Sequence, residues 1–324
     1  MKQKAARPGW AVLILAVFVA GGLRAQQEAD PNFNPAVARP AYTGTHPRVV
    51  IDEAHSNFHT ASGRYKPLAD LLRNDGYEVV AGTAPFTSES LAGIAVLIIA
   101  NASAPDADDD SSKPAFTEAE CDAVRDWVRE GGSLLLLADH APFGSAAEAL
   151  AARFGVGMGK GFVFDLRNSD RGPSALVFSR ENGLLGEHPL LRGRDAAETI
   201  SRVVAFTGQS LSAPEGAAVL LKLSPTAYEV SSRADVQAAI LAARTGGGSA
   251  GPAQSVAGRA QGIAFAFGKG RVVVLGEAGM FSAQLIRFEQ GGIKGEMKMG
   301  MNVEGNDDRQ FALNVLHWLS GILD

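Results

Sequence analysis

The sequence predicts an α/β fold in which a parallel β-sheet carries helices on both faces, making three layers, with an irregular region inserted. Short apolar runs alternate with amphipathic helical patterns, for example at Val96–Ala100 and Ser133–Ala138. Strands that are apolar throughout are typical of a sheet covered on both faces, and alternation with helices is typical of parallel strands. Hydrophobic residues make up 46% of the chain and charged residues 20%, which fits an ordinary globular protein.

The N-terminal elements follow one another at the spacing of strand–helix–strand units. Arg48–Asp52 is predicted as the first strand and Tyr65–Asn74 as a helix that Asp75-Gly76 ends. Tyr77–Ala81 is the second predicted strand, and Val96–Ala100 is the third. These apolar runs are expected to lie side by side and to run in the same direction.

The next unit opens with a capping box, Thr117-x-x-Glu120, which predicts a helix to Glu130. Cys121, Val124 and Val128 share one face of this helix. We therefore expect Cys121 to be a small core residue and not a nucleophile. The fourth strand follows at Ser133–Ala138, and a further helix is expected over 144–154.

The C-terminal part predicts two strands and a closing helix. Ile263–Phe267 and Arg271–Leu275 flank a tight turn, and the last helix spans about Asp307–Leu319 with Asn306 as its N-cap. The stretch from about 159 to 261 is less regular and is expected to elaborate the sheet. Within it, Thr245–Gln261 has low complexity and predicts a mobile loop.

The first residues predict a secretory signal over 1–25. A basic start precedes the apolar run Trp10–Ala20, and Leu23-Arg24-Ala25 follows with a small residue at its end. The run is shorter than the roughly 20 apolar residues that cross a bilayer. We expect a periplasmic or extracellular protein that meets a membrane only through this signal, if the signal is uncleaved. Residues 26–47 are predicted as a linker and 48–324 as a single domain.

Charge and cysteine content limit the partners. The formal net charge is −5, which argues against a nucleic-acid partner. The chain has one cysteine, so no intrachain disulfide is available. The expected partner is a small polar ligand or a protein of the cell envelope.

Polar residues gather directly after three predicted strands. The first strand is followed by Glu53, His55, Asn57 and His59, the fourth by Asp139 and His140, and the last by Glu277. Ligands of open parallel α/β sheets bind beyond the carboxyl ends of the strands, where these loops would meet. Asn306 and Arg309, at the start of the closing helix, are expected to lie over the same edge.

These residue types allow two chemistries. Glu53, His55, Asn57, His59, Asn306 and Arg309 are predicted to bind a ligand, and Asp139, His140 and Glu277 are the candidate catalytic residues. No cofactor is firmly predicted. As an alternative, His55, His59 and His140 would be metal ligands, with zinc the expected divalent metal. In a further alternative the same residues only cap strands and tie loops together.

Three stretches resemble the class I glutamine amidotransferase-like superfamily, in particular its ThuA-like members and the gliding-motility and intraflagellar-transport-type domains. These stretches are Val124–Leu137 (VRDWVREGGSLLLL), Gly268–Ser282 (GKGRVVVLGEAGMFS) and Asn306–Leu319 (NDDRQFALNVLHWL). The likeness covers most of 48–155 and 262–321, but not the region between them. It implies a flavodoxin-like sheet with its site beyond the fourth strand.

The chain departs from the family pattern at one decisive place. Catalytic members carry a nucleophilic cysteine after the fourth strand, where this chain has Asp139-His140. Glutamine amidotransfer through a thioester is therefore not expected. Three functions stay open: an exported domain that binds a small sugar- or peptide-like ligand, a metal-assisted hydrolase that uses the His, Asp and Glu cluster, and a structural scaffold.

Overall fold

A sheet of nine strands forms the centre of the part of the chain that the structure describes, residues 26–105, 113–170, 172, 174–245, 253–290 and 293–324 of a computed structural model. The predicted signal over 1–25 lies outside these residues, as do 246–252 of the predicted mobile loop. The strands of the central sheet are β2 (Arg48–Asp52), β3 (Glu78–Gly82), β4 (Val96–Ala100), β5 (Ser133–Leu137), β6 (Gly157–Met158), β10 (Leu211–Ser212), β11 (Ala218–Lys222), β14 (Ala260–Phe267) and β15 (Gly270–Leu275).

The main helices are α1 (Lys66–Asn74), α2 (Glu118–Arg129), α3 (Phe143–Ala152), α5 (Arg233–Thr245) and α6 (Asp308–Leu319), and the short ones are α4 (Pro189–Arg192), η2 (Ala196–Glu198) and η3 (Gly279–Phe281). The remaining strands form smaller sheets: β1 (Gln26–Ala29), β7 (Phe162–Asp165), β8 (Ala175–Ser179), β9 (Arg202–Phe206), β12 (Ala227–Val230), β13 (Gln254–Ser255), β16 (Ala283–Gln290) and β17 (Ile293–Gly300).

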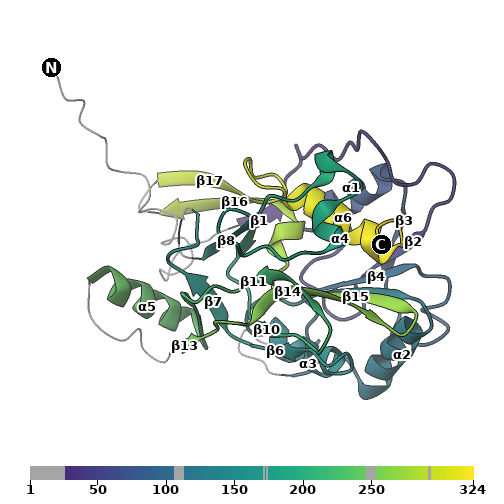
Figure 1. Cartoon of the computed structure of the whole chain (residues 1–324), viewed down its shortest axis with the longest axis horizontal. Helices are drawn as coiled ribbons and strands as arrows, with labels where there is room; N and C mark the ends of the chain where they lie inside the picture. The colour runs from purple at the N-terminus through teal and green to yellow at the C-terminus, as the bar shows by residue number, and fades with distance from the viewer. Residues whose placement is uncertain (1–25, 106–112, 171, 173, 246–252, 291–292) are drawn as a thin grey trace.

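The strand order confirms the predicted α/β fold. Five neighbouring strands, β3-β2-β4-β5-β15, pair in parallel, and β14 continues the sheet antiparallel to β15. Counted along the chain these five strands have the order 2-1-3-4-5, which is the flavodoxin-like arrangement. Figure 1 shows α1 and α6 on one side of the sheet and α2 and α3 on the other.

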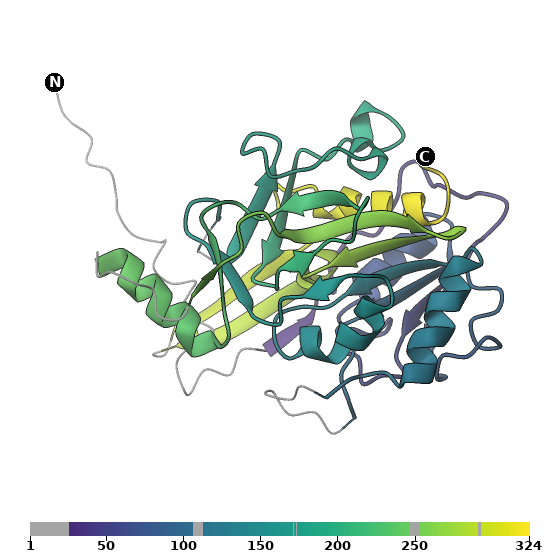
Figure 2. The ribbon, with the colours of Figure 1, turned by 60° about the horizontal axis from the view of Figure 1, so that its bottom comes forward.

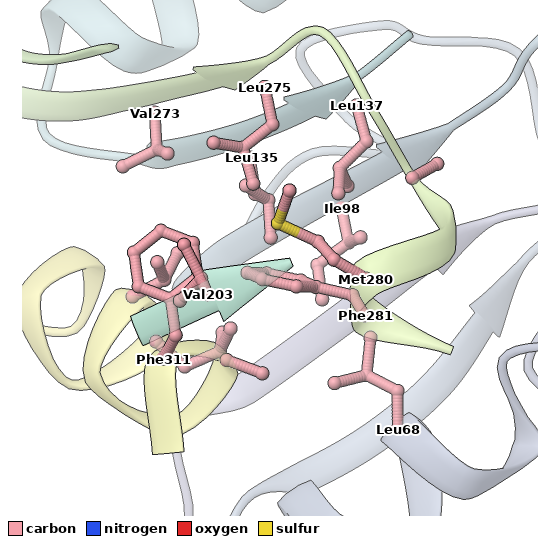
Figure 3. Close-up of a cluster of buried hydrophobic side chains, with 14 of the residues drawn as sticks. Leu68, Ile98, Leu135, Leu137, Val203, Val273, Leu275, Met280, Phe281 and Phe311 are labelled. Carbon is pink, nitrogen blue, oxygen red and sulfur yellow. The ribbon is translucent and has the colours of Figure 1, made fainter. Parts of the chain in front are cut away.

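Two apolar cores explain why the strands are apolar at every position. Alternate residues of one strand point to opposite faces, so Leu135 and Leu137 enter the core beside α6 while Leu134 and Leu136 enter the core beside α2. Figure 3 shows the first of these cores, in which strand side chains meet Phe311 of α6 and Phe281 of η3. Both rings are fully buried, and burying a Phe side chain contributes about 1.5–3 kcal/mol.

The helix boundaries agree closely with the sequence. The predicted capping box of α2 is present in both directions between Thr117 and Glu120. Cys121 is fully buried in the core, as predicted, and burial raises the pKa of its thiol to about 11. At α6 the N-cap position falls on Asp307 and not on Asn306, although the Asn306 side chain accepts from the amide of Asp308 at 3.2 Å.

The inserted region joins the central sheet through β10 and β11, and its other strands form small sheets beside that sheet. A two-stranded sheet joins β8 and β9, and a three-stranded sheet has the order β13-β12-β7. Figure 2 shows α5 at the end of the molecule away from α2. The predicted loop over 245–261 is only partly a loop, because β13 and the start of β14 fall within it.

The predicted linker over 26–47 proves to be attached to the body of the protein. β1 pairs antiparallel with β16, and the Glu28 carboxylate binds the Arg287 guanidinium. Phe33, Val37 and Tyr42 pack against the main core. The polar, proline-punctuated composition misled the prediction, because the partner strand lies far away in the sequence.

A search of the described helices finds none that is both long enough and apolar enough to traverse a lipid bilayer.

Candidate functional site

The loops after the parallel strands meet at one edge of the sheet. The Phe58 amide, after β2, donates to the Asn101 carbonyl after β4 at 2.9 Å. The Asn101 side chain in turn accepts from the Asp139 amide after β5 at 2.9 Å. The Tyr65 hydroxyl, also after β2, donates to the carbonyl of Ala278 after β15 at 2.7 Å. These bonds place the predicted site loops side by side at the carboxyl ends of the strands.

This edge contains the point at which the strand order reverses. β2 lies between β3 and β4, so the chain leaves β2 toward one side and later returns on the other, and ligands of such sheets commonly bind at this point. Ser56 after β2 and Asn101 after β4 have φ of 46° and 49°, in the left-handed region that serine seldom occupies and asparagine tolerates better. Backbone strain of this kind clusters at binding sites.

Asp139 and Glu277 form an acidic pair at this edge. Glu277 is 1% exposed, and its two carboxylate oxygens accept from the amides of Gly279 at 2.5 Å and Met280 at 2.8 Å. Burial, followed by the negative charge of Asp139, raises the pKa of Glu277 well above its usual range. The Asp139 side chain is 14% exposed. The pair therefore combines a buried carboxyl that favours its protonated form with a more accessible one.

The imidazole of His140 lies next to Asp139. Its Nδ1 lies 2.8 Å from the Ala141 carbonyl, and because a carbonyl only accepts, Nδ1 carries the hydrogen. In the neutral ring Nε2 then bears the lone pair, and it lies 3.9 Å from Asp139 Oδ1. The ring stacks on Phe162 of β7 at a centroid distance of 4.5 Å, so the inserted region holds it in place.

His59 lies in the wall of the site as a neutral ring. It is 2% exposed and stacks on Tyr65 with centroids 4.5 Å apart. Burial, and then the charge of Arg64, lowers the pKa of His59 to about 3. Burial, and then the charges of Glu277 and Asp139, raise the pKa of Tyr65. Tyr65 therefore connects the wall formed with His59 to the acidic pair.

Two phenylalanines line the outer rim. Phe58 is 41% exposed, and its ring lies 5.9 Å from the ring of Phe143. The Arg64 guanidinium rests over Phe58, 3.8 Å from the ring centroid. An exposed aromatic face beside buried polar groups is a common feature of ligand sites.

The side chains directly after β2 shape the loop, and they already make hydrogen bonds to other groups of the protein. His55 is held at both ring nitrogens, by Asp52 at 2.9 Å and by Glu120 of α2 at 2.9 Å. Burial alone would lower the pKa of His55, but the two carboxylates outweigh burial and raise it. The Asn57 side chain accepts from the His55 amide at 3.1 Å, and Glu53 accepts from the Ala61 amide at 2.7 Å.

Asn306 and Arg309 make their hydrogen bonds at the start of α6 and to the N-terminal segment, and not to the loops after the strands. Asn306 donates to the Asp308 carboxylate at 2.8 Å, and Arg309 donates to the Ala36 carbonyl at 2.5 Å. Asp308 is fully buried, and its charge adds to the effects that raise the pKa of Glu277. Asn306 is thus linked to Glu277 only through Asp308, and Arg309 binds the N-terminal segment.

The metal alternative finds no assembled ligand set in the part of the chain that is described. No group of three or more His, Cys, Asp or Glu side chains is arranged there to hold an ion. His55 has both ring nitrogens engaged, and His59 is stacked in the wall. A zinc ion would therefore need these side chains to rearrange.

The other histidines have structural roles. His188 accepts from the Leu190 amide at the start of α4, and burial lowers its pKa to about 4. His317 is fully buried and lies 2.7 Å from the Asp75 carboxylate. His46 bonds the Gly76 carbonyl.

Three residues of the site were missed by the sequence analysis. Asn101 directly follows β4, so the rule that selected Asp139 and Glu277 would also have found it. Tyr65 and Glu120 carry no such signal, because their partners lie in distant loops.

Comparisons with known proteins support the fold of this chain. No family model and no curated protein matches the sequence. Among solved structures, the mmIFT52 N-terminal domain is similar with a TM-score of 0.55 and 16% identity, over 85% of this chain and 97% of that domain. A ThuA-like protein from Bacteroides uniformis ATCC 8492 gives a TM-score of 0.43 and 16% identity, over 87% of this chain and 95% of that one. The similar structures thus include ThuA-like proteins.

Proposed function

We propose that this chain is an exported glutamine amidotransferase-like domain that binds a small polar ligand, sugar- or peptide-like, at the carboxyl edge of its sheet. The predicted signal over 1–25 supports export. The strand order and the resemblance of three sequence stretches support the domain type. The function is binding, with Asp139, His140 and Glu277 as the groups that meet the ligand.

The observation that carries this proposal is the acidic pair of Asp139 and Glu277 beside an exposed aromatic ring. Asp139 and His140 Nε2 offer hydrogen-bond acceptors, which suit a ligand rich in hydroxyl or amine donors. Phe58 offers an apolar face next to them. Pockets that combine aromatic surface with a few fixed polar groups are typical of small-molecule sites.

Amidotransferase chemistry does not fit the same site. The position after β5 holds Asp139 and His140, and Cys121 is buried within α2. Reactive thiols are accessible and have a lowered pKa, whereas burial raises the pKa of Cys121 to about 11. A thioester intermediate therefore has no nucleophile here.

A ligand panel tests the proposal. We expect one class among neutral sugars, amino sugars and short peptides to raise the melting temperature, because a ligand at 100 times its Kd adds about 2.7 kcal/mol of stability. Asp139→Asn should weaken that ligand about 10- to 100-fold, the range for a hydrogen bond to a charged group. Thermal shift followed by titration calorimetry measures both effects.

The matched control is Asp126→Asn, an exposed carboxylate of α2 paired with Arg125. It should bind the ligand as the wild type does. Equal loss of affinity in both variants, or no response to any member of the panel, would contradict a binding site at Asp139.

Hydrolysis is a second candidate function, favoured by the residue types at the same site. Burial and the charge of Asp139 raise the pKa of Glu277, which suits a general acid, and the imidazole of His140, held through Nδ1 by the Ala141 carbonyl, is a residue type that serves as a general base. Release of product from a bound member of the panel, lost in His140→Ala, would separate hydrolysis from binding alone.

A further inference from the structure

Gln209 lies in the inserted region between β9 and β10 and is fully buried. Its side-chain amide donates one hydrogen bond to the Ala138 carbonyl at 2.8 Å and one to the Asp139 carbonyl at 2.9 Å. Its side-chain oxygen accepts from the Lys160 amide at 2.9 Å. Two of these three side-chain hydrogen bonds of Gln209 therefore hold the loop after β5.

The backbone of Gln209 reaches the other acidic loop. Its amide donates to the Gly276 carbonyl at 2.8 Å, one residue before Glu277. Gln209 therefore binds the chain at Asp139 through its side chain and the chain next to Glu277 through its backbone. It connects the two loops that carry the acidic pair.

Two glycines lack the side-chain atoms that would collide with Gln209. A Cβ atom on Gly144 would lie 2.3 Å from the Gln209 side-chain oxygen, and a Cβ atom on Gly276 would lie 2.3 Å from the Gln209 carbonyl. Lys160, whose amide bonds Gln209, has a φ of 65°, a strained value for a residue other than glycine. Such a conformation persists where surrounding bonds hold it.

We propose that Gln209 is a positioning residue that fixes Asp139 relative to Glu277, so that the inserted region is part of the ligand site. The stacking of Phe162 of β7 on His140 supports the same conclusion from another part of the insertion. The proposal rests on the proposed binding site for its effect on a ligand. Its effect on the acidic pair needs no ligand and is tested separately.

The pH dependence of stability reports on the acidic pair. Glu277 faces Asp139, Asp308 and Tyr65, and it keeps its proton to higher pH in the folded chain than in the unfolded chain. Its contribution to stability is therefore present at low pH and is lost as the pH rises above the usual carboxyl range. If Asp139 moves away from Glu277, this loss becomes smaller.

The test compares Gln209→Leu with Gln261→Leu by urea unfolding from pH 5 to pH 8. Gln261 is the matched control, because it is equally buried and its side-chain amide donates to the carbonyl of Thr207 at 2.7 Å and, at 3.5 Å, to the backbone carbonyl of Gln209, but not to the loop of Asp139. Measured relative to the wild type, Gln209→Leu should flatten the fall of stability with pH that Glu277 contributes, so its stability deficit becomes smaller as the pH rises. The opposite contribution of His59 is present in both proteins and cancels in this difference. Gln261→Leu should lower stability by the same amount at every pH. Parallel curves for both variants and the wild type would overturn the proposal.

Gly144→Ala provides a second variant if Gln209→Leu does not fold. It leaves Gln209 in the chain but pushes against its side-chain oxygen, so the same flattening is expected. Where the wild type binds a ligand of the panel, Gln209→Leu should weaken it about 10-fold, as loss of a supporting hydrogen bond does elsewhere. A wild type that binds nothing contradicts the proposed function, while the pH curves still decide the role of Gln209.

Discussion

At the scale of single residues, burial of His59 in the wall of the site determines whether its ring is protonated. Its Nδ1 has no hydrogen-bond partner among the described residues, although the ring is buried. A buried nitrogen without a partner destabilises the folded state, and the stacking contact with Tyr65 offsets part of that cost. The folded chain therefore holds the ring neutral, while the unfolded chain protonates it at mildly acidic pH.

This difference predicts the behaviour of His59→Phe. Because the pKa is about 3 in the folded chain and about 6.5 when unfolded, stability is lost as the pH falls below 6.5. At pH 5 the loss from this one residue is about 2 kcal/mol. Phenylalanine keeps the stacked ring but cannot be protonated, so the variant should be more stable than the wild type at pH 5. Equal acid sensitivity in melts of both proteins at pH 5 and pH 7.5 would show that His59 is not the cause.

The sequence located some site residues but not their roles. Asp139 and Glu277 were found because each follows an apolar strand, a pattern that is visible locally. The role of His55 was not visible, because one of its two partners, Glu120, lies 65 residues away on α2. Ionisation and hydrogen bonding depend on such distant neighbours, so a sequence names candidates and the fold assigns their partners.

At the scale of elements, the N-terminus of α2 supports both the helix and the site. Glu120 accepts from the Thr117 amide at 2.9 Å as part of the capping box, and its other oxygen accepts from His55 at 2.9 Å. Burial alone would raise the pKa of Glu120, but the hydrogen bonds from His55 and Thr117 outweigh it and lower the pKa to about 2. One carboxylate thus joins the start of α2 to the loop after β2.

Thr117→Ala should therefore lower the melting temperature by about 2–4 °C, since a lost N-cap costs about 1 kcal/mol. Thr117→Ser retains the hydroxyl oxygen that accepts from the Glu120 amide and should melt close to the wild type. Thermal unfolding followed by circular dichroism measures both. An alanine variant as stable as the serine variant would contradict the role of this cap.

Regular elements were predicted where the local pattern was strong. The strands of the parallel sheet were found because short apolar runs stand between polar loops, and α2 because of its capping box. The β16–β17 hairpin and α5 were missed. Charged residues alternate along β17, and α5 has a weak apolar stripe. Neither element therefore has a clear local sequence pattern, and both depend on tertiary contacts.

At the scale of the whole molecule, the inserted region shares the main core. Val163, Phe178 and Val203 of the insertion are buried in the same cluster as Leu135 of β5 and Phe311 of α6. Figure 3 shows Val203 beside Phe311 and facing the strands of the central sheet. Removing the insertion would expose that face of the sheet to water.

We therefore expect the described body to unfold in one cooperative transition. Two of the three tryptophans, Trp127 and Trp318, lie in α2 and α6, so tryptophan fluorescence of a Trp10→Phe variant reports on these two helices, while circular dichroism reports on the whole chain. Urea midpoints from the two signals should coincide, as they do for a single folding unit. A separate early transition seen by circular dichroism alone would mean that the insertion is an independent domain.

The burial of Cys121 has a practical consequence. It is the single thiol of the chain and lies on the buried face of α2, where burial raises its pKa to about 11, so the native protein offers an alkylating reagent almost no thiolate. Each modified molecule then records an event in which α2 detached from the sheet. Timed alkylation read by mass spectrometry would count those openings in the natural sequence, without an engineered label.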